Sequence, residues 1–332
     1  MILHLKKDLS NNQAQDIANQ LSAFHIRYND IDVLISSSSM KEIPSSIEGF
    51  VDKSWVFSND IQLSSRSYIN GKREVSIGNI KIGGDQNKTI LIGGPCSVES
   101  EEQIRDSASL LVELGLSTLR GGCYKPRTSP YSFQGMGLEG LELLVKMREE
   151  YGLNVITEVR DASHVNEVIE YSDVIQIGAK AMYDQGILRA CSKTKKPVLI
   201  KRGFGSTLKE FVQAAEFVLS GGNENVILCE RGLRTFETNT RFTLDLCGVA
   251  WLQEYTNLPI ILDPSHAMGY AYGVPVLSRA CVAMGIDGLL IEAHPNPKVA
   301  KSDASQQLDH DEFRKLLTTL KPVAQSVGYS IV

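Results

Sequence analysis

The sequence repeats one unit eight times between Thr89 and Leu320: a short apolar segment, a polar residue at its end, and a segment with the spacing of an amphipathic helix. The apolar segments are Thr89–Gly93, Ser117–Arg120, Asn154–Glu158, Asp173–Ile177, Pro197–Lys201, Val226–Glu230, Pro259–Asp263 and Gly288–Glu292. Nearly continuous apolar strands that alternate with helices are typical of a parallel sheet covered by helices. Eight such units predict a closed (β/α)8 TIM barrel of the α/β class.

The composition is that of an ordinary soluble globular protein. Of the 332 residues, 42% are hydrophobic and 22% charged, and this length suffices for a barrel of about 250 residues plus a small domain. No apolar run approaches the ~20 residues of a membrane-spanning helix, and the first residues carry no signal-peptide pattern. The six cysteines have no paired spacing and the net charge is −5. We therefore expect a cytoplasmic protein with reduced thiols and no nucleic-acid partner.

Residues 1–60 predict a separate small domain of the ferredoxin-like α+β type. Its expected elements are a strand at Ile2–Leu5, a helix at Gln13–Phe24, extended chain at Tyr28 and Ile31–Ile35, a helical stretch near Pro44–Phe50 and a strand at Trp55–Phe57. The order β-α-β-β-α-β is that of the ferredoxin-like unit.

Residues 61–73 are polar and predict a linker, and residues 74–332 are expected to form the barrel domain. Segment 74–82 alternates apolar and polar residues around Gly78-Asn79, a pair that suits a tight two-residue turn. We expect this segment to be a β-hairpin that closes the floor of the barrel.

Four residues near strand ends have side chains that ligate divalent metals. Cys96 follows the first barrel strand, His266 follows the seventh, Glu292 ends the eighth, and Asp303 lies in the loop after it. Because ring closure makes the eighth strand a neighbour of the first, these side chains can converge on one sector of the rim. A thiolate, an imidazole and two carboxylates suit Mn²⁺, Fe²⁺, Co²⁺ or Zn²⁺.

Each of these residues also has an ordinary structural interpretation. An unpaired cysteine is usually a small buried apolar residue, and a loop aspartate such as Asp303 can simply cap a helix. His294, which also follows the eighth strand, is better interpreted as a residue beside the site than as a ligand. The expected convergence of Cys96, His266 and Glu292 favours the metal interpretation.

Positive charge gathers at the ends of strands two, four, five and six. Burying a cation there is costly unless an anion pairs with it, and arginine suits bidentate contacts with carboxylate or phosphate. This many cations predict a ligand with more than one anionic group. The residues concerned are Arg120, Lys125, Arg127, Lys180, Lys201, Arg202, Arg231 and Arg234.

Seven stretches at these strand ends together resemble the type Iβ 3-deoxy-D-arabino-heptulosonate 7-phosphate (DAHP) synthases with an N-terminal ferredoxin-like domain. They are Gly93–Glu99 (GGPCSVE), Leu119–Gly122 (LRGG), Lys125–Gly135 (KPRTSPYSFQG), Ile175–Ala179 (IQIGA), Lys201–Gly203 (KRG), Leu228–Gly232 (LCERG) and Asp263–His266 (DPSH). The resemblance covers the whole barrel and is looser over the first sixty residues.

The resemblance implies the first step of the shikimate pathway, in which phosphoenolpyruvate condenses with erythrose 4-phosphate and water to give DAHP and phosphate. It implies that a divalent metal, held by Cys96, His266, Glu292 and Asp303, polarises the aldehyde. Lys125 is then the expected general acid, and Glu158 orients the water. The implied phosphoenolpyruvate-binding residues are Arg120, Lys125, Lys180, Lys201 and Arg231, and the erythrose 4-phosphate-binding residues are Pro126, Arg127, Thr128 and Asp263.

Three positions depart from the family pattern. Ala304 stands where the family commonly has glycine after Ser-Asp, which puts the turn that positions Asp303 in doubt. Cys123 takes a position that is often alanine, beside the substrate loop, where we expect sensitivity to oxidation. Lys180 stands where relatives often carry arginine, which weakens the expected contact with phosphate.

Three alternatives stay open. The related 3-deoxy-octulosonate 8-phosphate synthases condense the same enol with arabinose 5-phosphate, but that family reads Lys-Ala-Asn-Arg where this chain has Lys125-Pro126-Arg127. A Schiff-base aldolase with Lys201 as the nucleophile would keep its activity in the presence of chelators. A barrel without activity that senses metabolites would have no need of intact metal ligands.

The resemblance also implies a regulatory N-terminal domain, with an aromatic amino acid inhibitor bound between subunits of a homotetramer. A stabilising or assembly role for this domain, without any ligand, is the alternative.

Overall fold

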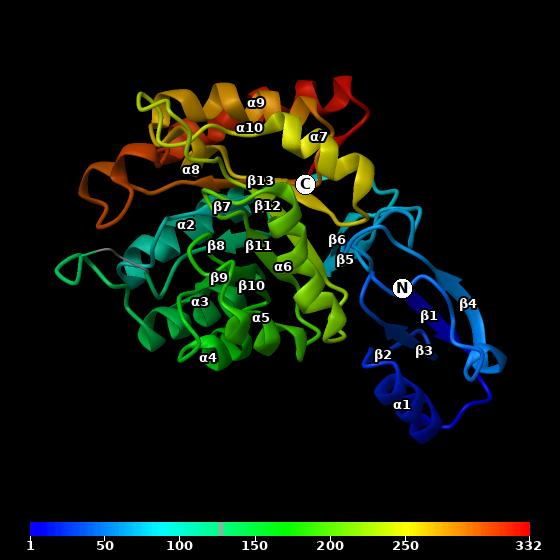
Figure 1. Ribbon diagram of the computed structural model, residues 1–332. Coiled ribbons are helices and arrows are strands. Elements are labelled where there is room, and N and C mark those ends of the chain that lie inside the picture. Colours follow the sequence, from blue (N-terminus) through cyan, green and yellow to red (C-terminus); the bar gives the residue numbers. More distant parts are fainter. Residues whose placement is uncertain (126–128) are drawn as a thin grey trace.

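The computed structural model describes residues 1–125 and 129–332 and contains a closed parallel barrel beside a small antiparallel sheet (Figure 1). Each barrel strand pairs in parallel with the next, and the last strand pairs back with the first to close the ring. The bounds agree within one residue with those expected from the sequence, which confirms the predicted TIM barrel. The strands are β7 (Lys88–Gly94), β8 (Thr118–Arg120), β9 (Asn154–Val159), β10 (Val174–Ile177), β11 (Val198–Lys201), β12 (Val226–Glu230), β13 (Ile260–Leu262) and β14 (Gly288–Glu292).

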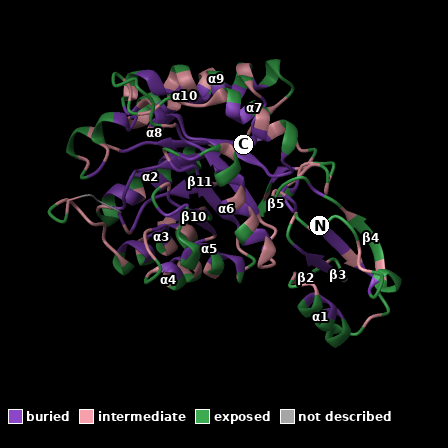
Figure 2. Ribbon diagram, viewed as in Figure 1, coloured by how far each residue is buried: buried purple, intermediate pink, exposed green. Residues whose placement is uncertain are grey.

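Helices cover the outside of the barrel, and Figure 2 shows buried strands within a surface of partly exposed helices. Thr207 caps one of these helices with a capping box: its side chain accepts a hydrogen bond from Glu210 N, and the Glu210 side chain accepts one from Thr207 N. The helices are α2 (Glu101–Glu113), α3 (Leu138–Tyr151), α4 (Val165–Tyr171), α5 (Gln185–Ser192), α6 (Leu208–Ser220), α7 (Leu246–Tyr255), α8 (Pro264–Met268), α9 (Val274–Ala283) and α10 (His310–Ser326).

Shorter elements complete the barrel. Three 3-10 turns lie in the loops around the last strand: η2 (Ala271–Gly273), η3 (Pro297–Val299) and η4 (Ala304–Gln306). A short strand near the C-terminus, β15 (Ser330–Ile331), pairs in parallel with the start of β7.

The floor of the barrel is closed by the expected hairpin. Strands β5 (Glu74–Ile77) and β6 (Ile80–Gly83) pair antiparallel across the two-residue turn Gly78-Asn79, and Gly78 has the positive φ of 55° that this turn requires. Val75, Ile77 and Ile82 are buried in one cluster with inward-facing residues of the barrel strands, such as Ile90 and Leu199. The barrel interior is therefore filled at its lower end by apolar side chains.

The N-terminal sheet has the strand order β2-β3-β1-β4, with all neighbours antiparallel. Its strands are β1 (Ile2–Leu5), β2 (Phe24–Tyr28), β3 (Ile31–Ile35) and β4 (Val51–Trp55), and helix α1 spans Asn11–Gln20. Alternate residues divide between two faces: Leu3 and Leu34 pack with Ile17 of α1, whereas Ile2 and Val33 belong to the same buried cluster as the barrel.

Three elements of this domain differ from the sequence expectation. The strand expected at Trp55–Phe57 lies earlier in the chain, at Val51–Trp55. Helix α1 begins earlier than predicted because Ser10 and Gln13 form a capping box, and it ends before Phe24, which belongs to β2. The helical stretch expected near residues 44–50 is only a 3-10 turn, η1 (Glu48–Phe50). The segment before it is rich in serine, which competes for backbone hydrogen bonds and disfavours a helix.

The segment after the N-terminal sheet is tied to the barrel by one carboxylate. Glu216 of α6 accepts hydrogen bonds from the backbone N–H groups of Gln62, Leu63 and Ser64 at 2.9, 3.2 and 2.8 Å. These bonds connect the linker directly to a barrel helix. None of the helices described is long and apolar enough to cross a membrane.

We predict that Ile77→Ala lowers the free energy of unfolding by about 2–5 kcal/mol, because it leaves a cavity in the apolar floor. Ser76→Ala is the matched control: Ser76 is exposed on the opposite face of the same strand, and its replacement should change stability by less than about 0.5 kcal/mol. Urea denaturation followed by circular dichroism measures both. Equal midpoints for the two variants would show that the hairpin does not support the barrel.

Candidate active site

The carboxyl ends of the barrel strands surround a cavity of about 560 Å³. Its wall combines cations, two carboxylates, a histidine and two aromatic rings, contributed by several strands and loops. The lining residues are Lys125, Ser132, Glu158, Ala179, Lys180, Lys201, Phe204, Arg231, Arg234, Arg241, Phe242, His266 and Asp303. Pro126, Arg127 and Thr128, predicted to bind the sugar phosphate, lie outside the described residues.

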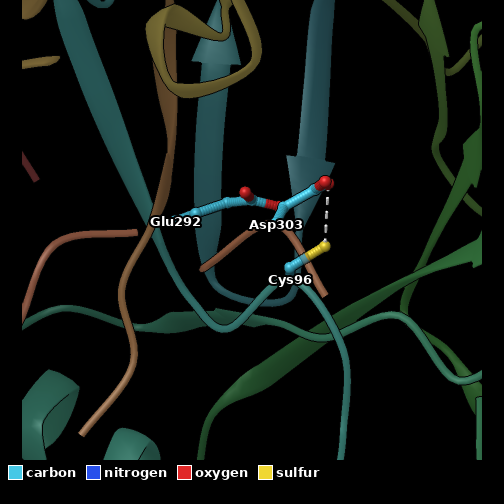
Figure 3. A group of neighbouring side chains, drawn as sticks. All are labelled: Cys96, Glu292 and Asp303. Carbon is cyan, nitrogen blue, oxygen red and sulfur yellow. Dashed lines mark hydrogen bonds between the residues drawn. The ribbon is translucent and has the colours of Figure 1, made fainter. Parts of the chain in front are cut away.

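Three of the four predicted metal ligands form one group, drawn in Figure 3. Cys96 follows β7, Glu292 ends β14, and Asp303 lies in the loop before η4. One ligand atom of each lies within 4.8 Å of the others, and Cys96 Sγ is 3.3 Å from Asp303 Oδ2. Pairing of β14 with β7 puts Glu292 opposite Gly94, which explains why residues so distant in sequence meet.

His266, the fourth predicted ligand, faces the same group from α8. Its Nε2 is 3.5 Å from Glu292 Oε1 and 3.8 Å from Asp303 Oδ2. Its Nδ1 lies 2.7 Å from the carboxylate of Asp263, which fixes the ring with Nε2 toward the group. Burial lowers the pKa of His266 and favours the neutral imidazole that ligates metals.

The donor set fits a divalent metal ion. Glu292 is fully buried, yet its Oε1 accepts no hydrogen bond from any described residue. Arg120 Nη2 lies 3.1 Å from this oxygen as an ion pair, without the angle of a hydrogen bond. Burial raises the pKa of the Cys96 thiol, so a cation is needed to stabilise its thiolate. One sulfur, one nitrogen and two carboxylates are a set that first-row metals accept.

The cavity also has a cationic wall, some of whose donors lack protein partners in the described part of the chain. Arg231 is 4% exposed, and its Nε and Nη1 have no hydrogen-bond partner among the described residues. Its guanidinium carbon lies 4.1 Å from the ring centroid of Phe242 and 5.5 Å from that of Phe204, so the rings hold the side chain in place. Buried donors without partners are costly, which indicates that an anion completes this wall.

Arg120 and Arg202 differ from Arg231 in their surroundings. Arg120 donates to the carbonyls of Pro95 and Cys96 at 3.2 and 3.3 Å, although its Nη1 has no partner among the residues described. Arg202 is buried between Glu230 and Asp245, at 2.9 and 2.8 Å. The charge of Arg202 is therefore paired within the fold, although its Nε also has no hydrogen-bond partner among the described residues. Lys180 and Arg234 line the cavity.

Lys125 lies between the metal group and the cavity. Its Nζ is 3.1 Å from Cys96 O and 3.2 Å from Cys96 Sγ. Burial by itself lowers the pKa of Lys125, but the nearby Cys96, Glu158 and Glu292 outweigh it and raise the pKa, which keeps the ammonium protonated. A protonated amine beside the proposed metal position is suited to donate a proton.

Glu158, near the end of β9, lines the cavity. Gln176 Nε2 donates to its Oε2 at 3.1 Å, and Gly178 gives it room, since a Cβ there would lie 2.0 Å from Glu158 Oε1. The contact with Gln176 thus fixes the direction of the Glu158 carboxylate, which lines the cavity.

Asp263 was expected to contact substrate hydroxyls, and this stays a prediction. The carboxylate is fully buried and does not line the cavity; it accepts from Lys201 Nζ, and from His266 N at 2.9 Å. Burial alone raises the pKa of Asp263, but His266 and Lys201 overcome this and hold the pKa well below its usual value. In this arrangement Asp263 orients Lys201 and His266.

Two of the three departures from the family pattern have a clear structural outcome. Asp303 itself takes the left-handed conformation, with φ 47°, and Ala304 begins η4, so the turn does not require glycine at position 304. Burial raises the pKa of the Cys123 thiol to about 12, which opposes the expected sensitivity to oxidation because the thiolate is the reactive form.

Several residues at the site were missed in the sequence. Gln307 Oε1 accepts from Cys96 N at 3.0 Å, and Gln306 contacts Glu292. Arg241 lines the cavity and lies 3.2 Å from Asp303 Oδ1. The only available signal was that both glutamines closely follow Asp303, since neither residue type is a metal ligand and Arg241 is not at a strand end.

Comparison with known proteins identifies close relatives of this chain. The model of the DAHP synthetase I family matches residues 58–327. A phospho-2-dehydro-3-deoxyheptonate aldolase of Thermotoga maritima is 44% identical over 270 residues, 81% of this chain and 79% of the relative. A crystal structure of the aldolase of that name (DAHP synthase) from the same organism has a TM-score of 0.80 at 37% identity and covers 100% of this chain and 99% of its own.

A second class of relatives is less similar. A 2-dehydro-3-deoxyphosphooctonate aldolase of Francisella tularensis is 32% identical over 265 residues, which cover 74% of this chain and 95% of the relative. The likeness to this class is weaker than that to the heptonate enzyme.

We predict that Asp263→Asn destabilises the protein by about 3–5 kcal/mol, because it leaves the Lys201 ammonium buried without its counter-charge. The double variant Asp263→Asn with Lys201→Met removes both charges and should recover most of this loss. Thermal unfolding with a chelator present measures the effect without any contribution from metal. A double variant no more stable than Asp263→Asn alone would contradict the proposed pairing.

Proposed function

The chain belongs to the DAHP synthetase I family, and from this premise we propose how its cavity condenses phosphoenolpyruvate with erythrose 4-phosphate and water, the first step of the shikimate pathway. The observation that carries the proposal is the meeting of Cys96, His266, Glu292 and Asp303 at a cavity that also has a cationic wall. A metal electrophile and an anion site in one cavity are what this reaction requires.

Phosphoenolpyruvate binds to the cationic wall, with its carboxylate and phosphate opposite Arg120, Lys180, Lys201 and Arg231. The unpartnered donors of Arg231 and Arg120 support this assignment. Asp263 holds the Lys201 ammonium in place, so the cation is oriented before substrate arrives. Pro126, Arg127 and Thr128 bind the phosphate of erythrose 4-phosphate by family resemblance alone.

Cys96, His266, Glu292 and Asp303 hold a divalent ion, which when bound supplies a Lewis acid for the aldehyde oxygen. Lys125 Nζ donates a proton to that oxygen as C3 of the enol forms a bond with the aldehyde carbon. The contact of this ammonium with Cys96 Sγ, at 3.2 Å, supports its position beside the reacting oxygen.

Water then adds to C2, where the positive charge left by the enol has developed. Glu158 orients this water and accepts its proton, and its fixed direction on the cavity wall supports this role. The bond between C2 and the phosphate oxygen then breaks, and the proton of the new C2 hydroxyl passes to the departing phosphate, which leaves inorganic phosphate and the C2 ketone.

The alternatives each meet a specific objection. A Schiff base would need Lys201 as a free amine, whereas its Nζ forms an ion pair with the buried Asp263. The octulosonate enzymes are less similar to this chain than the heptonate enzyme is. An inactive sensor would not be expected to keep four converging ligands.

Regulation by the N-terminal domain, through an aromatic amino acid bound in a homotetramer, belongs to the same proposal. The hydrogen bonds between Glu216 of α6 and the linker supply a connection. Helix α6 follows the loop that carries Phe204 to the cavity wall. Movement of the N-terminal sheet would therefore be transmitted toward the bound anion.

We predict that phosphate release from phosphoenolpyruvate and erythrose 4-phosphate is lost after treatment with EDTA and is restored by Mn²⁺. Erythrose 4-phosphate should be preferred to arabinose 5-phosphate by roughly 10–200-fold in kcat/KM. Faster turnover of the pentose would make the protein an octulosonate synthase. Activity that survives EDTA, together with a borohydride-trapped adduct on Lys201, would replace the metal mechanism by the Schiff-base one.

We predict that Lys125→Met lowers kcat by on the order of 10²–10⁴-fold, because the aldehyde oxygen loses its proton donor. Lys180→Met is the control on the same wall, and it should mainly raise KM for phosphoenolpyruvate. Steady-state kinetics with saturating Mn²⁺ separate the two effects. If both variants changed only KM, Lys125 would be a binding residue and not the acid.

A further inference from the structure

Arg241 and Gln306 connect both carboxylates of the proposed metal site to the wall of the cavity. Arg241 lies in the loop after β12 and lines the cavity, whereas Gln306 ends η4 and is fully buried. Arg241 Nη1 donates to Gln306 Oε1 at 2.6 Å and lies 3.2 Å from Asp303 Oδ1. Gln306 Nε2 in turn donates to Glu292 Oε2 at 2.5 Å.

The two oxygens of each carboxylate are therefore in different surroundings. Glu292 Oε2 accepts a hydrogen bond from Gln306. Glu292 Oε1 accepts no hydrogen bond among the described residues, and it lies 3.1 Å from Arg120 Nη2 as an ion pair and 3.5 Å from His266 Nε2. Asp303 Oδ1 faces Arg241, while Oδ2 is 3.3 Å from Cys96 Sγ and 3.8 Å from His266 Nε2. One oxygen of each acid points to the other ligands, and the second points to Arg241 or Gln306.

The orientation of the Gln306 amide is determined by its neighbours. A guanidinium has only donors, so the amide oxygen must face Arg241. The amide nitrogen must then face Glu292, which as a carboxylate only accepts. The chain from Arg241 through Gln306 to Glu292 consequently has a single consistent direction, and a flipped amide would break both bonds.

We propose that Arg241 and Gln306 are positioning residues that fix the rotation of Asp303 and Glu292, so that each carboxylate offers a single oxygen to the metal. The inference rests on the metal role of these acids in the proposed function. Groups that hydrogen-bond to ligating carboxylates orient them, and their loss typically weakens metal affinity by about 10–100-fold. Arg241 also lines the cavity, so the same guanidinium faces the ligands and the bound anion.

The test uses the purified full chain and Mn²⁺ alone, with free Mn²⁺ measured by electron paramagnetic resonance. Gln306→Met keeps the length of the side chain but removes the amide, and it should raise the Kd for Mn²⁺ roughly 10–100-fold. Arg241→Met should do the same, and because this side chain is 39% exposed it tests the proposal even if the buried variant fails to fold. Arg241→Lys should recover part of the affinity, since it restores a donor toward Asp303.

Arg234→Met is the matched control. Arg234 lines the same cavity and lies over Phe204 at 5.5 Å, and none of its described contacts is to Asp303 or Glu292. Its replacement should leave the Kd for Mn²⁺ unchanged. The double variant of Arg241 and Gln306 should lose less affinity than the product of the two single losses, because both act on Glu292 through one chain.

The visible spectrum of the Co²⁺-loaded protein is a second readout that does not depend on activity. A carboxylate free to rotate changes the ligand set, so the Co²⁺ bands should shift in the two methionine variants at positions 241 and 306 and stay unchanged in the control. Wild-type Kd values and spectra in both variants would overturn the positioning role while leaving the metal site intact. Failure of the wild-type protein to bind Mn²⁺ or Co²⁺ would overturn the metal site, and the positioning role with it.

Discussion

The hydrogen bonds between β14 and β7 are the constraint on which the site depends. They put Glu292 opposite Gly94, two residues before Cys96, and thereby join groups up to 207 residues apart in sequence. The strands approach so closely that a Cβ at Gly288 would lie 2.7 Å from Ile90 Cγ2. An open sheet of the same strands would keep its core but would separate the thiol from the carboxylates. Ring closure therefore brings the proposed metal ligands together.

The buried cations around the rim are of two kinds. Some are paired with acidic residues of the protein, and Arg231 has no such acidic partner among the described residues. Arg202 is neutralised within the protein by Glu230 and Asp245, and Lys201 by Asp263. Arg231 is equally buried, but aromatic rings surround it where the others have acids. A buried cation without a fixed counter-charge raises the free energy of the empty protein, and an incoming anion recovers that free energy. The favourable pairing of the Arg231 charge therefore forms only when an anionic ligand binds.

The sequence predicted best what depends on periodicity and on strand ends. The eight barrel strands were found because each is a continuous apolar segment, and barrel geometry then brought Cys96, Glu292 and Asp303 together. Helix ends were less accurate, since α1 is set by the capping box of Ser10. The prediction of a second helix in the N-terminal domain was wrong because a serine-rich segment has a weak helical preference.

What the sequence could not supply was the direction of side chains. Asp263 and Arg202 are both at strand ends, yet both are turned toward partners inside the protein and away from the cavity. The contact of Gln306 with Glu292 depends on the path of the loop through Asp303, whose left-handed backbone has no sequence marker. Such contacts follow from three-dimensional packing, which local patterns do not encode.

The apolar hairpin at the barrel floor determines by which route substrates enter the cavity and products leave it. Val75, Ile77 and Ile82 seal one end, so reactants and both products must use the same opening at the other end. Arg231 is only 4% exposed, so a molecule bound to it lies deep in the cavity. This molecule must bind before a second molecule that fills the opening, and it cannot leave while the second molecule is bound. A cavity with one opening therefore favours ordered binding of the substrates and ordered release of the products.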